Sequence, residues 1–277
     1  MSVPAIIAVD IDGTLIGSHK RIPRFTRDEI HRVVREYGTR LFIVTARGPE
    51  STAVIEEELG VHGSYATFGG ALVWARKDDG SFTTLRETPI PEEVVAGILN
   101  ASSGLDVHSG VYSREDWYVS SLDYWGLREA RNTAVWPTVT AIDSTLLGRV
   151  GPIFKVMFRG ETQDLTRLEQ LLAPFASRAY IHNSGRVLEI ISSDAVKLPA
   201  VQQLCMHFGL ALEDVISFGD SAADVEMLEG CGIGVLMGNA RPELVVAGHV
   251  ERTLSNDEDG IGMSLRKHFP TDALFRP

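Results

Sequence analysis

Two aspartates stand one residue apart, directly after a short apolar run near the start of the chain. The run AIIAV, residues 5–9, leads into Asp10 and Asp12, and a Gly13-Thr14 turn follows. A carboxylate oxygen can attack phosphorus and form an aspartyl-phosphate. A second carboxylate nearby can protonate the leaving group and later activate water. The pair therefore favours phosphoryl transfer, although an Asp-Gly turn at the end of a strand needs no function by itself.

Two further apolar runs, residues 41–44 and 215–218, also end in polar signals. The polar residues that follow them are Thr45, Ala46, Arg47, Asp220 and, four residues later, Asp224. The carboxyl ends of parallel strands share one edge of a sheet, where α/β proteins bind ligands. Carboxylates gathered there repel one another unless a cation lies among them, and oxygen ligands without His or Cys suit Mg²⁺.

The set of motifs resembles the haloacid dehalogenase superfamily of phosphohydrolases, in its Cof-type phosphatase subfamily. The stretches that carry the resemblance are DIDGTL (10–15), IVTAR (43–47), Lys197, GDSAAD (219–224), GVLMGNA (234–240) and SNDEDGI (255–261). Each motif alone is modestly specific, whereas all of them in this order are highly specific.

The resemblance implies a role for each matching residue. Asp10 is expected to be the nucleophile and Asp12 the general acid/base, with Lys197 neutralising charge between Asp10 and the phosphate. Mg²⁺ would be held by Asp10, Asp12 (through its backbone carbonyl) and Asp220, with Asp224 in support. The residues expected to bind phosphate or substrate are Gly13, Thr14, Thr45, Ala46, Arg47 and Asn239. Arg47 fits a surface position equally well, and Asn239 could be a plain turn former.

Three positions depart from the usual Cof-type pattern. Ala223 stands where Asn is usual before the last acidic residue, Gly69 stands where Asn often precedes Gly-Ala, and Leu198 replaces a small residue after the lysine. None of them removes a nucleophile, an acid/base, the lysine or a metal carboxylate. They concern hydrogen bonds around the site and to the substrate.

The elements around the motifs predict a doubly wound, Rossmann-like α/β core with a parallel sheet. Its first helix is expected to begin with a Thr26–Glu29 capping box and to stop at Gly38. From about residue 82 the strands lose their fully apolar character, and helices are expected near 91–100 and 162–175. This pattern predicts an inserted α+β cap with an antiparallel sheet and helices on one face. The expected core comprises residues 1–81 and 187–277, and the expected cap comprises residues 82–186.

Composition narrows the class of partner. The 277 residues carry a formal net charge of −11, which disfavours nucleic acid and anionic membranes as partners. No apolar run approaches the roughly 18 residues that span a bilayer, and the N-terminus lacks the features of a signal peptide. Two cysteines without metal-ligand spacing fit a reducing cytoplasm. The expected partner is a small phosphorylated metabolite, and the oligomeric state stays open.

These observations predict a Mg²⁺-dependent phosphatase that acts through an aspartyl-phosphate. A phosphomutase, which passes the phosphoryl group to a sugar rather than to water, is the nearest alternative. A catalytically idle protein that binds sugar phosphates in a regulatory role is the third. The intact set of Asp10, Asp12, Lys197 and Asp220 argues against the third.

Overall fold

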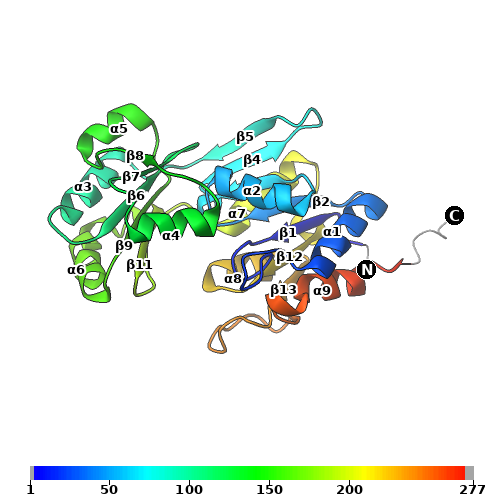
Figure 1. The fold of residues 1–277 in the computed structure, drawn as a ribbon. Coiled ribbons are helices and arrows are strands. Elements are labelled where there is room, and N and C mark those ends of the chain that lie inside the picture. Colours follow the sequence, from blue (N-terminus) through cyan, green and yellow to red (C-terminus); the bar gives the residue numbers. More distant parts are fainter. Residues whose placement is uncertain (1–2, 272–277) are drawn as a thin grey trace. The chain divides into compact units, whose positions relative to one another are not determined.

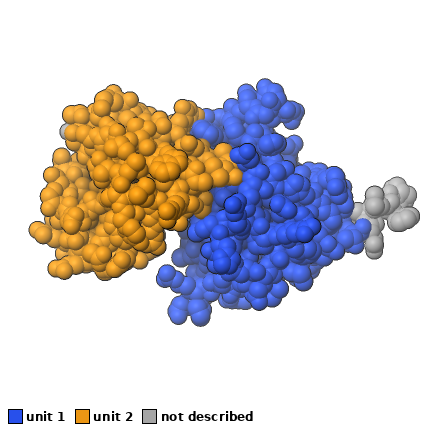
Figure 2. All heavy atoms as spheres, in the orientation of Figure 1, with its two compact units in different colours: residues 1–46, 55–86, 196–277 blue, residues 47–54, 87–195 orange. Residues whose placement is uncertain are grey.

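The structure, a computed structural model, describes residues 3–271 and divides into two compact units (Figure 2). The first unit comprises residues 1–46, 55–86 and 196–277, and the second comprises residues 47–54 and 87–195. The predicted cap, residues 82–186, differs from the second unit at both ends and does not include residues 47–54. The strand of residues 82–87 belongs to the sheet on which the first unit is built, and the strand of residues 187–192 belongs to the sheet of the second.

The first unit is built on an eight-stranded sheet with the order β14-β13-β12-β1-β2-β3-β4-β5 (Figure 1). Its strands are β1 (Ile6–Val9), β2 (Arg40–Val44), β3 (Ser64–Thr67), β4 (Leu72–Arg76), β5 (Phe82–Glu87), β12 (Val215–Gly219), β13 (Ile233–Leu236) and β14 (Glu251–Arg252). The pairs from β14 through β3 are all parallel, and β4 joins β3 antiparallel. The predicted parallel core is confirmed.

Helices cover both faces of this sheet. They are α1 (Arg24–Tyr37), α2 (Pro49–Leu59), which extends into the second unit, α7 (Lys197–His207), α8 (Val225–Gly230) and α9 (Gly260–His268), with short 3₁₀ turns η1 (Phe68–Gly70), η3 (Leu212–Asp214), η4 (Ala222–Asp224) and η5 (Asn256–Glu258). Alternate residues of β1 enter opposite layers: Ile7 and Val9 pack with α1 and α9, whereas Ile6 and Ala8 pack with α7. Burial on both faces explains why β1 is apolar throughout. No helix within residues 3–271 is long and apolar enough to cross a membrane.

The start of α1 corrects the predicted capping box. The helix begins at Arg24, after Pro23, so Thr26 and Glu29 lie inside it. The N–H of Thr26 donates to Oδ1 of Asp259 at 2.8 Å, and Glu29 pairs with Arg32 and with Arg266 of α9. One free N–H group of the first turn is therefore satisfied by a distant residue rather than by a local side chain. The predicted stop at Gly38, with φ 67°, is confirmed.

The second unit is built on a six-stranded sheet with the order β10-β11-β9-β6-β7-β8 (Figure 1). Its strands are β6 (His108–Tyr112), β7 (Trp117–Val119), β8 (Thr138–Val139), β9 (Lys155–Arg159), β10 (Ala179–Asn183) and β11 (Val187–Ser192). Its helices are α3 (Glu92–Ser102), α4 (Tyr124–Thr133), α5 (Ser144–Val150) and α6 (Thr162–Leu172), with a 3₁₀ turn η2 (Ala173–Phe175). All pairs are antiparallel except β7 with β8, so the predicted α+β insert is confirmed.

The two faces of this second sheet differ in chemistry. One face packs Val111, Val156 and Phe158 against the apolar sides of α3, α5 and α6. The other face carries polar side chains, and α4 contacts it through Glu129, which pairs with Arg159. The expectation of helices on one face alone is therefore wrong, because α4 lies on the second face and supplies the carboxylate that Arg159 of β9 needs.

Candidate active site

The candidate catalytic residues stand where three neighbouring strands of the first unit end. Asp10 follows β1, Thr45 follows β2 and Asp220 follows β12, and these strands are adjacent and parallel. The backbone continues the sheet one step further, since the N–H of Asp10 donates to the carbonyl of Phe218 at 3.2 Å. The sheet therefore delivers the polar residues to one edge, as the motif positions predicted.

Lys197 lies buried among these carboxylates. Its Nζ is 2.8 Å from Oδ1 of Asp10 and 2.6 Å from Oδ1 of Asp224. The residue opens α7, and only 5% of its side chain is exposed. A lone lysine before a helix is ordinarily solvated. Here its charge is placed between two buried carboxylates, so it is part of the site.

Asp224 anchors the loop that carries Asp220. Its Oδ2 accepts hydrogen bonds from the N–H of Ser221 at 3.0 Å, from the Ser221 hydroxyl at 2.7 Å and from the N–H of Asp220 at 3.3 Å. With Oδ1 bound to Lys197, both of its oxygens have partners inside the protein. Asp224 thus fixes Lys197 and Asp220 in place.

Two glycines are required by close approach at this point. A Cβ on Gly13 would lie 2.3 Å from Oδ2 of Asp220, and the φ of Gly13 is +81°. A Cβ on Gly219 would lie 2.4 Å from the Cβ of Asp224. Thr14 donates from Oγ1 to Oδ1 of Asp220 at 3.1 Å. The DGT and GDS sequences therefore interlock, which is possible only without side chains at these two positions.

Burial and mutual repulsion shape the ionisation of the cluster. Burial raises the pKa of Asp10 to about 7, against the opposing charge of Lys197. Burial and the neighbouring charge of Asp224 raise the pKa of Asp220 to about 6. For Asp224 burial acts in the same direction, but the ammonium and hydrogen bonds of Lys197 outweigh it and lower the pKa. One ammonium therefore does not compensate the two buried carboxylates, Asp10 and Asp224, and the half-buried Asp220.

The donor set fits a divalent cation. Asp10, Asp220 and Asp224 each offer a carboxylate oxygen, and these oxygens lie within 4.8 Å of one another. All the donors are hard oxygens, the kind of ligand that Mg²⁺ and similar cations prefer. A cation among them would remove the uncompensated negative charge described above. The cluster is thus a candidate metal site for a divalent ion.

The other predicted binding residues take different places. Thr45 is buried, and its backbone joins the site loops: its carbonyl accepts from the N–H of Gly69 at 2.8 Å. Ala46 is exposed. Arg47 is buried and donates to the Ser51 hydroxyl at 3.1 Å, so the surface alternative for it is wrong.

Asn239 is used within the protein. Its amide nitrogen donates to the carbonyl of Gly13 at 2.8 Å, and its amide oxygen accepts from the N–H of Asn256 at 3.0 Å. The same nitrogen is 3.5 Å from Oδ2 of Asp220. These bonds tie the loop after β13 to the Gly13 turn. A direct role in binding substrate stays a prediction.

The departures from the Cof-type pattern have local explanations in two cases. Leu198 fills the space left by Gly230, whose Cβ would lie 2.6 Å from a methyl of Leu198. Gly69 has φ 70°, and Gly70 lies so close to α7 that a Cβ would be 2.5 Å from the carbonyl of Val196. Ala223 is exposed, and nothing in the structure explains the change from Asn.

Among the neighbours of the motif residues that sequence reasoning missed is Lys20. Lys20 pairs with Asp12, with Nζ 3.0 Å from Oδ1. Its position eight residues after Asp12 lies outside the matched motifs, and a single lysine in a polar turn gives no signal in a sequence.

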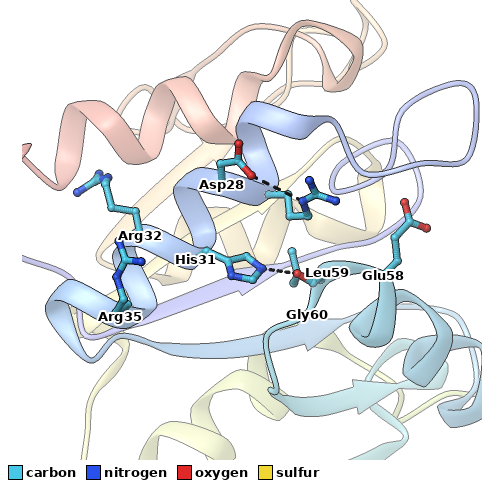
Figure 3. Close-up of a pocket in the computed structure, with 8 residues that line it drawn as sticks. Asp28, His31, Arg32, Arg35, Glu58, Leu59 and Gly60 are labelled. Carbon is cyan, nitrogen blue, oxygen red and sulfur yellow. Dashed lines mark hydrogen bonds and ion pairs between the residues drawn. The ribbon is translucent and has the colours of Figure 1, made fainter.

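A separate hollow of about 540 Å³ lies between α1 and the end of α2, near the start of β3 (Figure 3). It is lined by Arg27, Asp28, His31, Arg32, Arg35, Glu58, Leu59 and Gly60. Each of its three arginines has a carboxylate within 4 Å, and His31 bonds to the carbonyl of Leu59 at 2.5 Å. Because these charges are already compensated, the hollow does not attract the phosphate group of a substrate in place of the candidate active site.

A comparison with known protein families matches nearly the whole chain, including all the motif residues. The family description of the haloacid dehalogenase-like hydrolases matches residues 7–265. The chain belongs to this family. Its motif order and inserted sheet are those of the Cof-type phosphatases, and the chain is a phosphatase, a hydrolase of phosphoric monoesters.

Relatives and solved structures match over nearly the whole chain. A 5-amino-6-(5-phospho-D-ribitylamino)uracil phosphatase of Bacillus subtilis is 27% identical over 96% of this chain and 98% of its own. An HMP-PP phosphatase of Serratia proteamaculans is 29% identical over 89% of this chain and 91% of its own. The structure of a haloacid dehalogenase-like hydrolase from Bacteroides thetaiotaomicron has a TM-score of 0.84, with 24% identity over 96% of this chain and 100% of that one. A subclass IIB sugar phosphatase has a TM-score of 0.76, with 23% identity over 95% and 98%.

Proposed function

We propose that this protein hydrolyses a small phosphorylated metabolite with Mg²⁺, through an aspartyl-phosphate on Asp10. The observation that carries the proposal is Lys197, held by Asp10 and Asp224 inside a cluster of three carboxylates. A structural cluster gains nothing from placing two buried carboxylates and a half-buried one around a single ammonium, whereas a site for a cation and a phosphate needs them. The idle binding protein is disfavoured by the same geometry.

The residues would divide the work as follows. An Asp10 oxygen attacks phosphorus and forms the aspartyl-phosphate while the bond from phosphorus to the leaving oxygen breaks, and Asp12 gives that oxygen a proton. Water then attacks the same phosphorus while Asp12 takes a proton from that water. The bond between Asp10 and phosphorus breaks, which releases inorganic phosphate and restores the Asp10 carboxylate. Lys197 and the N–H groups of the Gly13 turn stabilise the charge on the phosphoryl oxygens.

Asp10, Asp220 and the backbone carbonyl of Asp12 would hold Mg²⁺, with Asp224 supporting them. When bound, the ion supplies charge that screens the carboxylates from the phosphate and polarises the phosphoryl group. The raised pKa of Asp10 and of Asp220 supports this assignment, since a cation beside them would offset the burial and repulsion that disfavour their ionised forms.

The substrate class is proposed from the relatives together with the second unit. The relatives act on a phosphorylated ribityl compound and on HMP-PP, and a structurally similar protein is a sugar phosphatase. We propose that the second unit, which the sequence predicts as a cap over residues 82–186, selects among such substrates. We also propose that the protein works in the cytoplasm, where Cys205 and Cys231 stay free thiols.

The test is phosphate release over a panel of sugar phosphates, nucleotides, HMP-PP and the ribitylaminouracil phosphate. Turnover is expected to stop on chelation and to return better with Mg²⁺ than with Ca²⁺, because Ca²⁺ takes more ligands and a looser geometry. Full turnover after thorough chelation contradicts the metal assignment. Isomerised sugar phosphate in place of free phosphate indicates the phosphomutase alternative.

A further inference from the structure

Lys20 forms an ion pair with Asp12, the expected acid/base. Its Nζ lies 3.0 Å from Oδ1 of Asp12, and about half of each side chain is exposed, 49% and 48%. Exposed ion pairs contribute little to stability, because water screens them and the side chains lose freedom. The pair therefore has little value as a structural link, and its position next to the reacting groups calls for another explanation.

The turn that carries Lys20 is closed by its own backbone. The N–H of Gly17 donates to the carbonyl of Arg21, and the N–H of Lys20 donates to the carbonyl of Gly17, both at 2.9 Å. An isolated bridge joins Asp12 to Ile16, just before the turn. The backbone of Lys20 is thus fixed relative to the backbone of Asp12.

The same turn is bound to a distant segment. The N–H of Ser18 donates to Oδ1 of Asp257 at 2.8 Å, and the side chain of Asn256 donates to the carbonyl of Ile16 at 2.8 Å. A Cβ on Gly17 would lie 2.6 Å from Oδ1 of Asp257. The turn is therefore a fixed support and not a free loop.

Lys20 itself has a backbone conformation that a side chain disfavours. Its φ is +58°, in the left-handed region where glycine or asparagine is the usual residue. Strained conformations of this kind persist where the surrounding structure imposes them, and they gather at functional sites. A lysine at this position indicates that its side chain is used.

We propose that Lys20 is a positioning residue for Asp12, and this rests on the proposed function. The ammonium of Lys20 holds the Asp12 side chain in one orientation, so that its carboxyl group is presented to the leaving oxygen without first having to be ordered. The contribution is made in the step in which the bond from phosphorus to the leaving group breaks. It matters most for alkyl phosphates, whose alkoxide leaves only with a proton. It matters least for p-nitrophenyl phosphate, whose phenolate leaves without one.

The experiment compares kcat/KM for a sugar phosphate and for p-nitrophenyl phosphate in Lys20→Met and Lys20→Arg, because kcat/KM reports the steps up to cleavage of the leaving group. Lys20→Met is expected to lose about fivefold on the sugar phosphate, the upper range for an exposed pair, and less than about twofold on p-nitrophenyl phosphate. Lys20→Arg keeps the charge and is expected to restore most of the loss. Arg21→Met is the matched control, because it removes a neighbouring charge that pairs with Glu58 instead.

A second comparison repeats Lys20→Met in an Asp12→Asn background. The additional loss is expected to vanish, because there is no carboxylate left to position. Equal losses on both substrates, no loss at all, or the same loss with Asn at position 12 overturn the proposal. Failure of the proposed function is seen separately: the unmodified chain then releases phosphate from neither substrate, which overturns both.

Discussion

Two regions of this phosphatase, the loops around Asp224 in the first unit and the polar face of the sheet in the second, treat their polar groups in opposite ways. In the first unit Asp224 has both carboxylate oxygens bound within the protein, and the Gly13 and Gly219 loops interlock without room for a side chain. In the second unit three buried nitrogen atoms on the polar face of the sheet, Trp117 Nε1, His108 Nε2 and Arg159 Nε, have no hydrogen-bond partner among the described residues. The loops around Asp224 satisfy their polar groups within the protein, whereas the polar face of the second sheet keeps buried nitrogen atoms unsatisfied.

The difference indicates a division between chemistry and choice of substrate. A phosphoryl group is the same in every substrate, so the residues that handle it can be fixed once and held rigidly. The remainder of the substrate varies, and a face with adaptable polar and aromatic groups suits that variety. Variants of the first unit should therefore affect all substrates alike, and variants of the second should affect them unequally.

The largest effect is expected for Asp10→Asn. An amide is nearly isosteric with the carboxylate but is a far weaker nucleophile, so phosphate release should fall by about 10⁴-fold or more on every substrate. The measurement is phosphate release across the panel, with circular dichroism to show that the fold persists. Substantial turnover by verified mutant protein rules out Asp10 as the nucleophile.

Lys197→Met is expected to depress all substrates together by roughly 10²- to 10³-fold, because it removes charge that stabilises the phosphoryl oxygens. It also leaves the buried carboxylates of Asp10 and Asp224 unpaired, at a cost of about 3–5 kcal/mol in unfolding free energy. Lys197→Arg, which keeps the charge, separates loss of activity from loss of fold. Lys267→Met, at a surface lysine paired with Glu251, is the matched control. A Lys197 variant that only changes the preference among substrates contradicts the division.

Variants on the polar face of the second sheet are expected to change kcat/KM by up to about tenfold, and by different factors for different substrates. Tyr180→Ala and Glu189→Gln test this, since neither residue is buried and both lie on that face by strand register. Leu171→Ala is the control, because Leu171 is an exposed residue of α6, the helix that packs on the opposite face of the sheet. Equal losses for every substrate mean that this face does not select.

The smallest effect concerns stability. The pKa of Asp10 is raised by burial to about 7, so folding favours its neutral form. The stability that depends on that form is complete below about pH 4 and is lost as the pH rises through 7. Without metal, Asp10→Asn should therefore gain about 2 kcal/mol of unfolding free energy relative to the parent between pH 5 and pH 8. Urea unfolding with a chelator measures it, and a difference that does not change with pH refutes the raised pKa.

The positions of the candidate catalytic residues in the first unit could be predicted from sequence because they depend on local spacing. Asp10 and Asp220 each follow an apolar strand directly, so the sheet places them without any detail of packing. The burial of Lys197 could be inferred only from the motif order, and the engagement of Asn239 with Gly13 depends on a contact 226 residues apart in the sequence. Long-range contacts of that kind leave no mark on a single sequence.

The first unit also shows where local rules fail. Thr26 and Glu29 have the spacing of a capping box, yet the N–H group of Thr26 is satisfied by Asp259 from the other end of the chain. In the second unit α4 and α5 were not predicted, because each is short and its apolar stripe is weak or interrupted. Tertiary contacts decide such elements, and propensity alone does not.

The most direct test of the account is to trap the covalent intermediate. Asp12→Asn should slow hydrolysis of the aspartyl-phosphate, while p-nitrophenyl phosphate still transfers its phosphoryl group without a general acid. After an acid quench, reduction with borohydride converts an aspartyl-phosphate to homoserine, which mass spectrometry can locate. The account predicts homoserine at position 10 and none when Asp10 is also replaced by Asn. Homoserine at another aspartate, or phosphate release from this variant with no modified residue, would contradict it.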